Sequence, residues 1–226
     1  MRGLAWLFLA CPLGCASLPS ITPARTPQER QQSVQACLRV FPKGYWRATH
    51  SIDATMPLGN NALLLGVTAV EPQGMRSVLL SPEGIALFDA SLEGGKLAVR
   101  RALPPLNRKG FAEGLIADVR HTFVPPAGEP SEVGTYASGA GACRWSLPED
   151  KTTDIELRGL QPIAIRGYQG ASLVREVTVS GDSDDGWYSE LHLRVTGVGG
   201  YSMVMRLIDH EPGGQPVPSQ EPPAAH

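Results

Sequence analysis

The feature that most constrains this chain is an alternation of apolar and polar residues with a period of two. It is clearest in WYSELHLRV, Trp187–Val195, and it repeats in YSMVMRLI, Tyr201–Ile208. Successive side chains of a strand point to opposite faces, so this period is typical of a half-buried β-strand. The connection TGVGG, Thr196–Gly200, can supply the positive φ angles of a hairpin turn. These residues therefore predict an antiparallel β-hairpin.

Segments of the same kind recur along most of the chain. In WRATHSIDATM, Trp46–Met56, the apolar residues share one face, and His50 interrupts that face. Further strands are expected at Ala62–Glu71, Arg76–Ser81, Ile85–Ser91, Lys96–Ala102, Ala142–Leu147, Thr153–Arg158, Ile163–Gly167 and Leu173–Ser180. A single sheet of this length curls or closes. The sequence thus predicts a mainly β (α+β) fold, a curved antiparallel sheet or open half-barrel of about nine to eleven strands.

Two helices are expected to lie across the mouth of this sheet. The first, Pro27–Arg39, follows Thr26, which can cap it, while Glu29 can complete a capping box. The second, Gly110–Phe123, repeats apolar residues about every four positions, as an amphipathic helix does. A curved sheet closed by helices can enclose an apolar volume. The candidates to line its concave face, each of which also fits an ordinary core, are Trp46, Ile52, Leu63, Leu65, Phe88, Phe111, Leu115, Trp187 and Tyr201.

The N-terminus has the parts of a bacterial export signal. Arg2 precedes the short apolar run LAWLFLA, Leu4–Ala10, which is far too short to span a bilayer. PLGC, ending at Cys15, resembles the lipobox of bacterial lipoproteins, and FLAC, ending at Cys11, is a rival. An ordinary secretory signal with an unmodified Cys15 is the other alternative. We therefore divide the chain into a signal peptide (1–14), a tether beginning at the lipid anchor Cys15 (15–25), a folded domain (26–212) and a disordered, Pro-rich tail (213–226).

Two cysteines remain outside the signal. Cys37 and Cys143 form an even pair in an exported chain, which favours a disulfide, with two buried free thiols as the alternative. The formal net charge is −2 and no block of like charge stands out, so nucleic acid is not an expected partner.

Residues with catalytic spacing are scarce. The sequence contains no nucleophile elbow, zinc motif, phosphate loop or dinucleotide fingerprint, so we expect no enzyme, metal or cofactor. His50 is interpreted as a hydrogen-bonded core histidine. A hydrolase or isomerase that pairs His50 with Asp53 is the weakest hypothesis, because the two residues fall on opposite faces of one strand.

Longer phrases carry a family resemblance. The segments Ser81–Phe123 and Gly200–Pro212, with the lipobox and the capped first helix, look like outer-membrane lipoproteins related to the lipoprotein-localisation carrier and receptor (LolA/LolB-like). That resemblance implies an open β half-barrel with a helical lid that holds acyl chains of lipids or lipoproteins. It also implies that Leu58, in MPLGN, corresponds to the receptor's membrane-contacting loop residue.

Two functions are therefore expected from the sequence. In the first, the chain is a lipid-anchored lipoprotein of the outer membrane, facing the periplasm, that binds an amphiphilic ligand and passes lipid or lipoprotein cargo to outer-membrane lipid. In the second, the same domain packs solidly and acts as a non-catalytic scaffold with a protein partner in the envelope.

Overall fold

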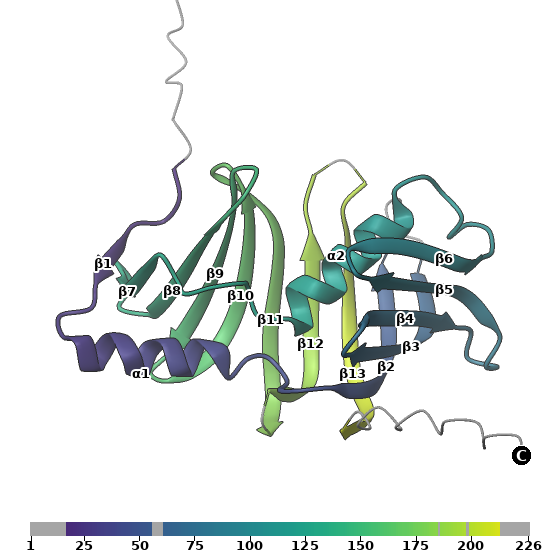
Figure 1. Cartoon of the computed structure of the whole chain (residues 1–226), viewed down its shortest axis with the longest axis horizontal. Coiled ribbons are helices and arrows are strands. Elements are labelled where there is room, and N and C mark those ends of the chain that lie inside the picture. Colours follow the sequence, from purple (N-terminus) through teal and green to yellow (C-terminus); the bar gives the residue numbers. More distant parts are fainter. Residues whose placement is uncertain (1–16, 56–60, 185, 198, 213–226) are drawn as a thin grey trace, which may run out of the picture.

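A computed structural model describes residues 17–55, 61–184, 186–197 and 199–212 (Figure 1). The expectations for Cys11, Cys15, Leu58 and the tail at 213–226 lie outside the described residues. Within them, the chain forms thirteen strands and two helices. These are β1 (Ile21–Pro23), α1 (Pro27–Leu38), β2 (Trp46–Thr55), β3 (Asn61–Glu71), β4 (Gly74–Leu80), β5 (Ala86–Glu93), β6 (Lys96–Ala102), α2 (Phe111–Phe123), β7 (Glu132–Tyr136), β8 (Gly141–Leu147), β9 (Lys151–Arg158), β10 (Gln161–Gln169), β11 (Ser172–Asp184), β12 (Trp187–Val195) and β13 (Tyr201–Pro212).

All the described strands belong to one antiparallel sheet in the order β1-β7-β8-β9-β10-β11-β12-β13-β2-β3-β4-β5-β6. Most neighbouring strands are also consecutive in the chain, as in a meander. β13 pairs with β2 and so joins the half formed by β1 and β7–β13 to the half formed by β2–β6. The sheet is curved and unclosed, with β1 and β6 at its two ends. The predicted fold class is confirmed, with two strands more than the upper end of the expected range.

The two additional strands come from segments in which the sequence analysis expected no strand. β1 lies within the predicted tether 15–25, and β7 lies in the Gly- and Pro-rich stretch before Gly141. They pair with each other, with Thr22 opposite Thr135. Gly134 allows this close approach, because a Cβ there would lie 1.8 Å from the Thr22 carbonyl oxygen. The tether prediction is therefore corrected: residues 21–23 belong to the sheet.

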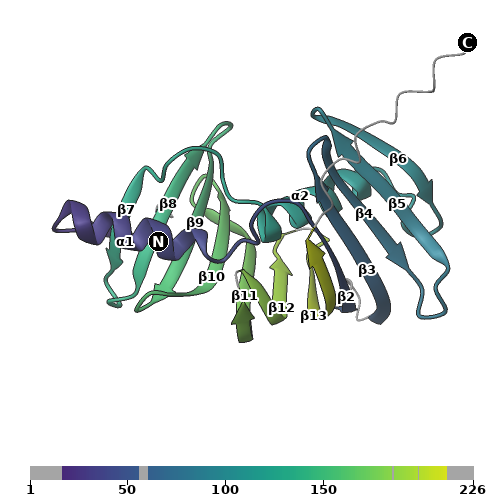
Figure 2. The same cartoon turned by 60° about the horizontal axis from the view of Figure 1, so that its bottom comes forward.

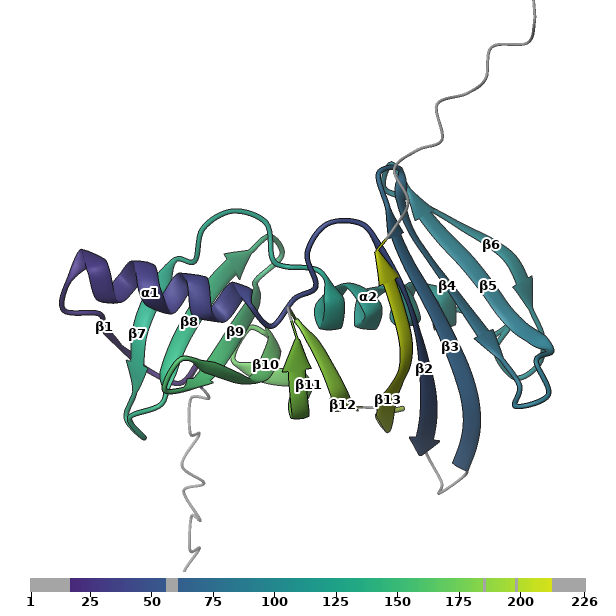
Figure 3. The ribbon, with the colours of Figure 1, turned by 90° about the horizontal axis from the view of Figure 1, so that it is seen from below.

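Both helices lie on the same face of the sheet, which is its concave face (Figures 2 and 3). The strand register brings the side chains of Cys143, Ile155, Ile165, Val177 and Leu193 into one row on that face. α1 lies along the β7–β10 half, and α2 crosses the middle of the sheet towards β5. The hydrophobic core lies between this face and the two helices.

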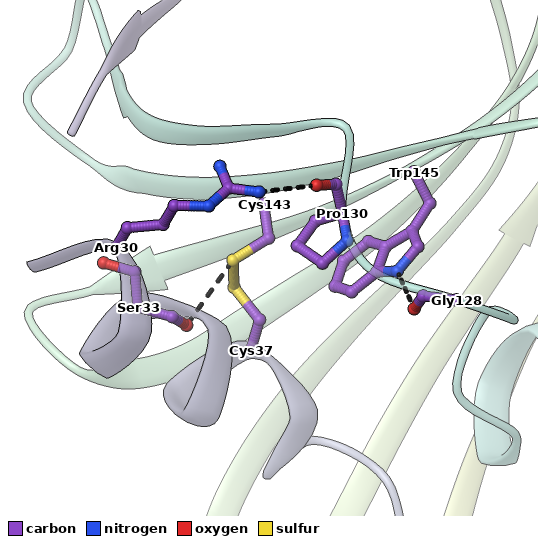
Figure 4. The surroundings of a disulfide bond; sticks show 7 residues. All are labelled: Arg30, Ser33, Cys37, Gly128, Pro130, Cys143 and Trp145. Atoms are coloured by element: carbon purple, nitrogen blue, oxygen red, sulfur yellow. Dashed lines mark hydrogen bonds between the residues drawn. A yellow bond between two sulfur atoms is a disulfide. The ribbon is translucent and has the colours of Figure 1, made fainter. Parts of the chain in front are cut away.

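α1 is fixed by its cap and by a covalent bond. The Glu29 amide donates to Thr26 Oγ1 at 3.1 Å, and the Glu29 carboxylate accepts from the Thr26 amide at 3.2 Å, which is the predicted capping box. Cys37, at the buried end of the helix, forms the predicted disulfide with Cys143 of β8 (Figure 4). The bond closes a loop across 106 positions and holds α1 against the sheet.

The N-terminal segment is held on the opposite, convex face. Arg144 follows Cys143 in β8, so its side chain points to the opposite face. It forms a bidentate ion pair with the fully buried Asp154, through two contacts of 2.7 Å. The Tyr136 hydroxyl donates to the same carboxylate at 2.8 Å. Arg144 Nη2 also donates to the Pro19 carbonyl at 2.8 Å. This network therefore ties the residues before β1 to the outer side of β8.

Candidate functional site

A cavity lies between α2 and the middle of the concave face. Its walls come from five strands of the sheet, including β2 and β13, and from the inner side of α2. About 30 Å³ of it can be reached by the centre of a water molecule, which is room for one or two waters. The lining residues are His50, Ile52, Gly66, Thr68, Ser77, Leu79, Leu115, Asp118, Val119, Thr122, Phe123, Leu193, Met203 and Met205.

Two of the predicted lining residues, Ile52 and Leu115, face this cavity directly. Four others hold the ends of α2 on the sheet through aromatic contacts. Phe111, at the start of the helix, packs edge-on against Phe88 with 5.1 Å between ring centroids. Phe123, the last residue of the helix, packs against Trp46 with 5.5 Å between ring centroids. Trp46 in turn packs against Trp187 with 5.0 Å between ring centroids. These side chains therefore position the cover of the cavity.

The expectation that Leu63 and Leu65 line the concave face is wrong. In the register between β2 and β3, Leu64 lies opposite Ile52, and Gly66 lies opposite His50. Leu63 and Leu65 therefore point to the convex face, and the Leu63 side chain is 54% exposed. In β3 both faces are apolar, so the sequence could not fix which set points inwards.

A buried polar cluster interrupts the apolar wall beneath α2. Asp118, on the inner side of α2, is 3% exposed, and its carboxylate accepts from Arg175 Nε of β11 at 2.5 Å. The hydroxyl of Tyr201 of β13, which was also predicted to line the concave face, donates to the other carboxylate oxygen. Burial raises the pKa of Asp118, and the Arg175 guanidinium opposes that shift. The cluster therefore joins the middle of α2 to two strands of the sheet.

Two histidines lie close to this site. His50 is 3% exposed, and burial lowers its pKa to about 4, which supports its interpretation as a neutral core residue. His121 follows Asp118 by one turn of α2, and its pKa is also lowered to about 4, first by burial and then by the charge of Arg175. His121 Nε2 is buried and has no hydrogen-bond partner among the described residues. Gly167 leaves room for this ring, because a Cβ there would lie 3.0 Å from His121 Cε1.

The sequence analysis missed Asp118 and Arg175. The sequence carried a signal for both, because each is a charged residue at a position where the pattern is apolar. Asp118 falls among the apolar positions of its helix, and Arg175 lies on the same strand face as Leu173 and Val177. Their contact joins residues 57 positions apart, so the local pattern could not pair them.

The described residues form neither a metal site nor a membrane-spanning helix. No group of three or more His, Cys, Asp or Glu side chains among them could hold a metal ion. None of the helices in this part of the chain is both long enough and apolar enough to cross a membrane.

The sequence matches one protein family. The model of the family described as "Protein of unknown function (DUF3261)" matches residues 47–195, which run from β2 to the end of β12. The chain therefore belongs to the DUF3261 family. A comparison with curated protein sequences finds no match.

Three solved structures superpose on most of this chain. A LolA superfamily protein from Nitrosomonas europaea superposes with a TM-score of 0.56 at 9% identity, covering 83% of this chain and 94% of that one. An outer membrane lipoprotein-sorting protein domain from Vibrio parahaemolyticus has a TM-score of 0.45 at 11% identity, covering 81% and 92%. A DUF1329 family protein from Desulfovibrio piger has a TM-score of 0.44 at 10% identity, covering 82% and 92%. The first of these shows that the chain has a LolA-like fold.

Proposed function

We propose that this chain is a lipid-anchored envelope lipoprotein that binds the acyl chain of an amphiphile beneath α2 and assists lipid or lipoprotein localisation to the outer membrane. The observation that carries the proposal is the apolar cavity enclosed between α2 and the concave face of a LolA-like sheet. Burial of each CH₂ group of such a chain would contribute about 0.8 kcal/mol. The role is one of binding, and no catalytic step is assigned to it.

The proposed binding needs α2 to act as a lid. About 30 Å³ of reachable space is too little for an acyl chain, so in this proposal the structure is the closed state. α1 is held to β8 by a disulfide, whereas α2 is held by its aromatic ends and the Asp118 cluster, which are non-covalent. Movement of α2 would therefore open the apolar wall without breaking a covalent bond.

Two features support an anchored location on the periplasmic side of the outer membrane. The disulfide between Cys37 and Cys143 is typical of an oxidising compartment such as the periplasm. The anchor residue in the proposal, Cys15, lies four positions before Pro19, whose carbonyl accepts a hydrogen bond from Arg144. The chain would thus leave the anchor at the β1 end of the sheet, on the convex face.

Native mass spectrometry tests the binding role. A variant that begins at Ala16, and so lacks the anchor, would be purified without detergent from a Gram-negative host. We expect a co-purified amphiphile, and we expect Leu115→Glu to abolish it, because Leu115 lines the cavity. Leu63→Glu is the matched control, since it places the same charge on the exposed convex face and should retain the ligand.

A scaffold is the second candidate, and the small volume of the cavity favours it. The sheet also ends in β6, where Val99 is 48% exposed, so an edge strand is available to a partner. An apo mass for the wild type, with no uptake of added fatty acid or lipopeptide, would refute the binding role and support the scaffold.

A further inference from the structure

We propose that Arg175 and Tyr201 form a subsite for the anionic head group of the bound amphiphile, and that the Asp118 carboxylate occupies this subsite while α2 is closed. The inference rests on the proposed binding function and adds a class of ligand to it. That class is an amphiphile with a single acyl chain and a carboxylate or phosphate head.

The two donors belong to the sheet, and their present acceptor belongs to the lid. Arg175 of β11 lies opposite Val195 of β12, and Val195 lies opposite Tyr201 of β13. Both side chains therefore project from one row of the concave face. When α2 moves, Asp118 moves with it, while the guanidinium and the phenol stay on the sheet, on two strands that are separated by β12 alone. The displaced carboxylate leaves behind a preformed pair of donors.

The chemistry of this pair suits an anion with two or more oxygens. The guanidinium binds carboxylate and phosphate oxygens in a planar arrangement, and the Tyr201 hydroxyl adds a second direction of donation. In the closed state each donor already binds a different oxygen of the same carboxylate. A carboxylate or phosphate on a ligand can therefore replace the Asp118 side chain group for group.

The subsite also has the right position relative to the apolar wall. Asp118 is itself one of the residues that line the cavity, so the cluster and the cavity are continuous. The side chain of Arg175 is 26% exposed, whereas the side chain of Asp118 is 4% exposed, which places the cluster near the rim of the cavity. Leu193 and Met203 lie directly opposite each other on β12 and β13 and continue the wall inwards. A head bound at Arg175 would therefore leave its tail against apolar side chains.

Charge balance makes the subsite selective. In the closed state Arg175 is neutralised by Asp118, and the neighbouring His121 is kept neutral by burial and by the charge of Arg175. Opening of α2 without a new anion leaves a partly buried guanidinium without its counter-charge, which is costly. An anionic head restores the pair, whereas a neutral head does not. The lid is therefore expected to favour anionic over neutral amphiphiles of equal chain length.

The test compares three ligands that share one acyl chain: palmitate, lysophosphatidic acid and monopalmitoylglycerol. The full chain, in a neutral detergent, would be titrated with each ligand and the adducts counted by native mass spectrometry. We expect Arg175→Gln to weaken palmitate or lysophosphatidic acid about tenfold, the scale of one charged hydrogen bond, and not to weaken monopalmitoylglycerol. The anion that responds more strongly identifies the head-group chemistry. Arg206→Gln is the control, because it removes the same charge from the exposed convex side.

A second variant changes affinity in the opposite direction and so cannot be mistaken for misfolding. Asp118→Asn removes the competing carboxylate and is expected to strengthen binding of the anionic ligand severalfold. Equal losses for all three ligands in Arg175→Gln, or weaker anion binding in Asp118→Asn, would overturn the subsite while leaving the binding function in place. Failure of the wild type to bind any of the three ligands would overturn both.

Discussion

Replacing His50 by Gln is expected to change how the stability of this protein depends on pH. His50 lies on the buried face of β2, is 3% exposed, and packs against Phe123 with 5.4 Å between ring centroids. Gln removes the titratable ring and keeps a polar side chain of similar length. The comparison therefore isolates the effect of burying a neutral imidazole.

The direction and size of the effect follow from the two pKa values. The unfolded chain binds a proton on His50 below its ordinary pKa of 6.5, whereas burial lowers the pKa in the folded protein to about 4. Between these values the unfolded state binds more protons, so the free energy of unfolding falls as the pH falls. One pKa unit corresponds to about 1.4 kcal/mol, so His50 should remove about 3 kcal/mol of stability by pH 4. Well above pH 6.5 neither state is protonated at His50, so it contributes no slope there.

Urea unfolding followed by tryptophan fluorescence at several pH values between 8 and 4 measures this difference. Wild type should lose about 3 kcal/mol more than His50→Gln between pH 7 and pH 4, and the two curves should run parallel above pH 7. His121, whose pKa is also lowered, is present in both proteins, so its effect cancels in the comparison. Parallel curves over the whole range would show that burial of His50 does not keep it neutral.

Three further outcomes are expected. Replacing Cys37 and Cys143 together by Ser should lower the free energy of unfolding by about 5 kcal/mol, the chain-entropy value for a loop closed across 106 positions, and a reductant should have the same effect on the wild type. Asp154→Asn removes the buried counter-ion of Arg144 and leaves it only the longer, 3.4 Å contact to the exposed Glu132, so urea unfolding should show a loss of about 3–5 kcal/mol, and a loss below 1 kcal/mol would contradict the buried network. In cells labelled with radioactive palmitate, wild type and Cys11→Ala should carry label and Cys15→Ala should not; an unlabelled wild type would indicate an ordinary secretory signal.

The sequence predicted the strands of the meander because alternation and turn residues are local signals. β1 and β7 were not predicted, since ITP and EVGTY are short and contain Pro or Gly. β1 becomes a strand by pairing with β7, and β7 by pairing with β1 and β8. The capping box at Thr26 was also local, and its prediction was confirmed. The disulfide was predicted from the number of cysteines and the export signal, not from geometry.

The candidate site was less predictable because its parts meet only through tertiary structure. The run ALLLGV in β3 is apolar on both faces, so only pairing with β2 decides that Leu64, and not Leu63, lies opposite Ile52. The Asp118 cluster joins one helix to two strands that follow it by 57 and 83 positions. Asp118 and Arg175 each break an apolar pattern, and such breaks mark candidate sites even when their partners cannot be named.

The Asp118 cluster also bears on how the lid that we propose could be released. A buried ion pair adds little net stability compared with apolar side chains of the same volume, because both charges lose their hydration. An apolar residue in place of Asp118, with an apolar partner, would therefore close α2 at least as tightly, yet no ligand could compete for that contact. A carboxylate held by Arg175 and Tyr201 can be replaced by another carboxylate or a phosphate, and the ligand then supplies the interaction that the lid gives up. The opening of α2 and the choice of ligand would thus depend on the same two donors.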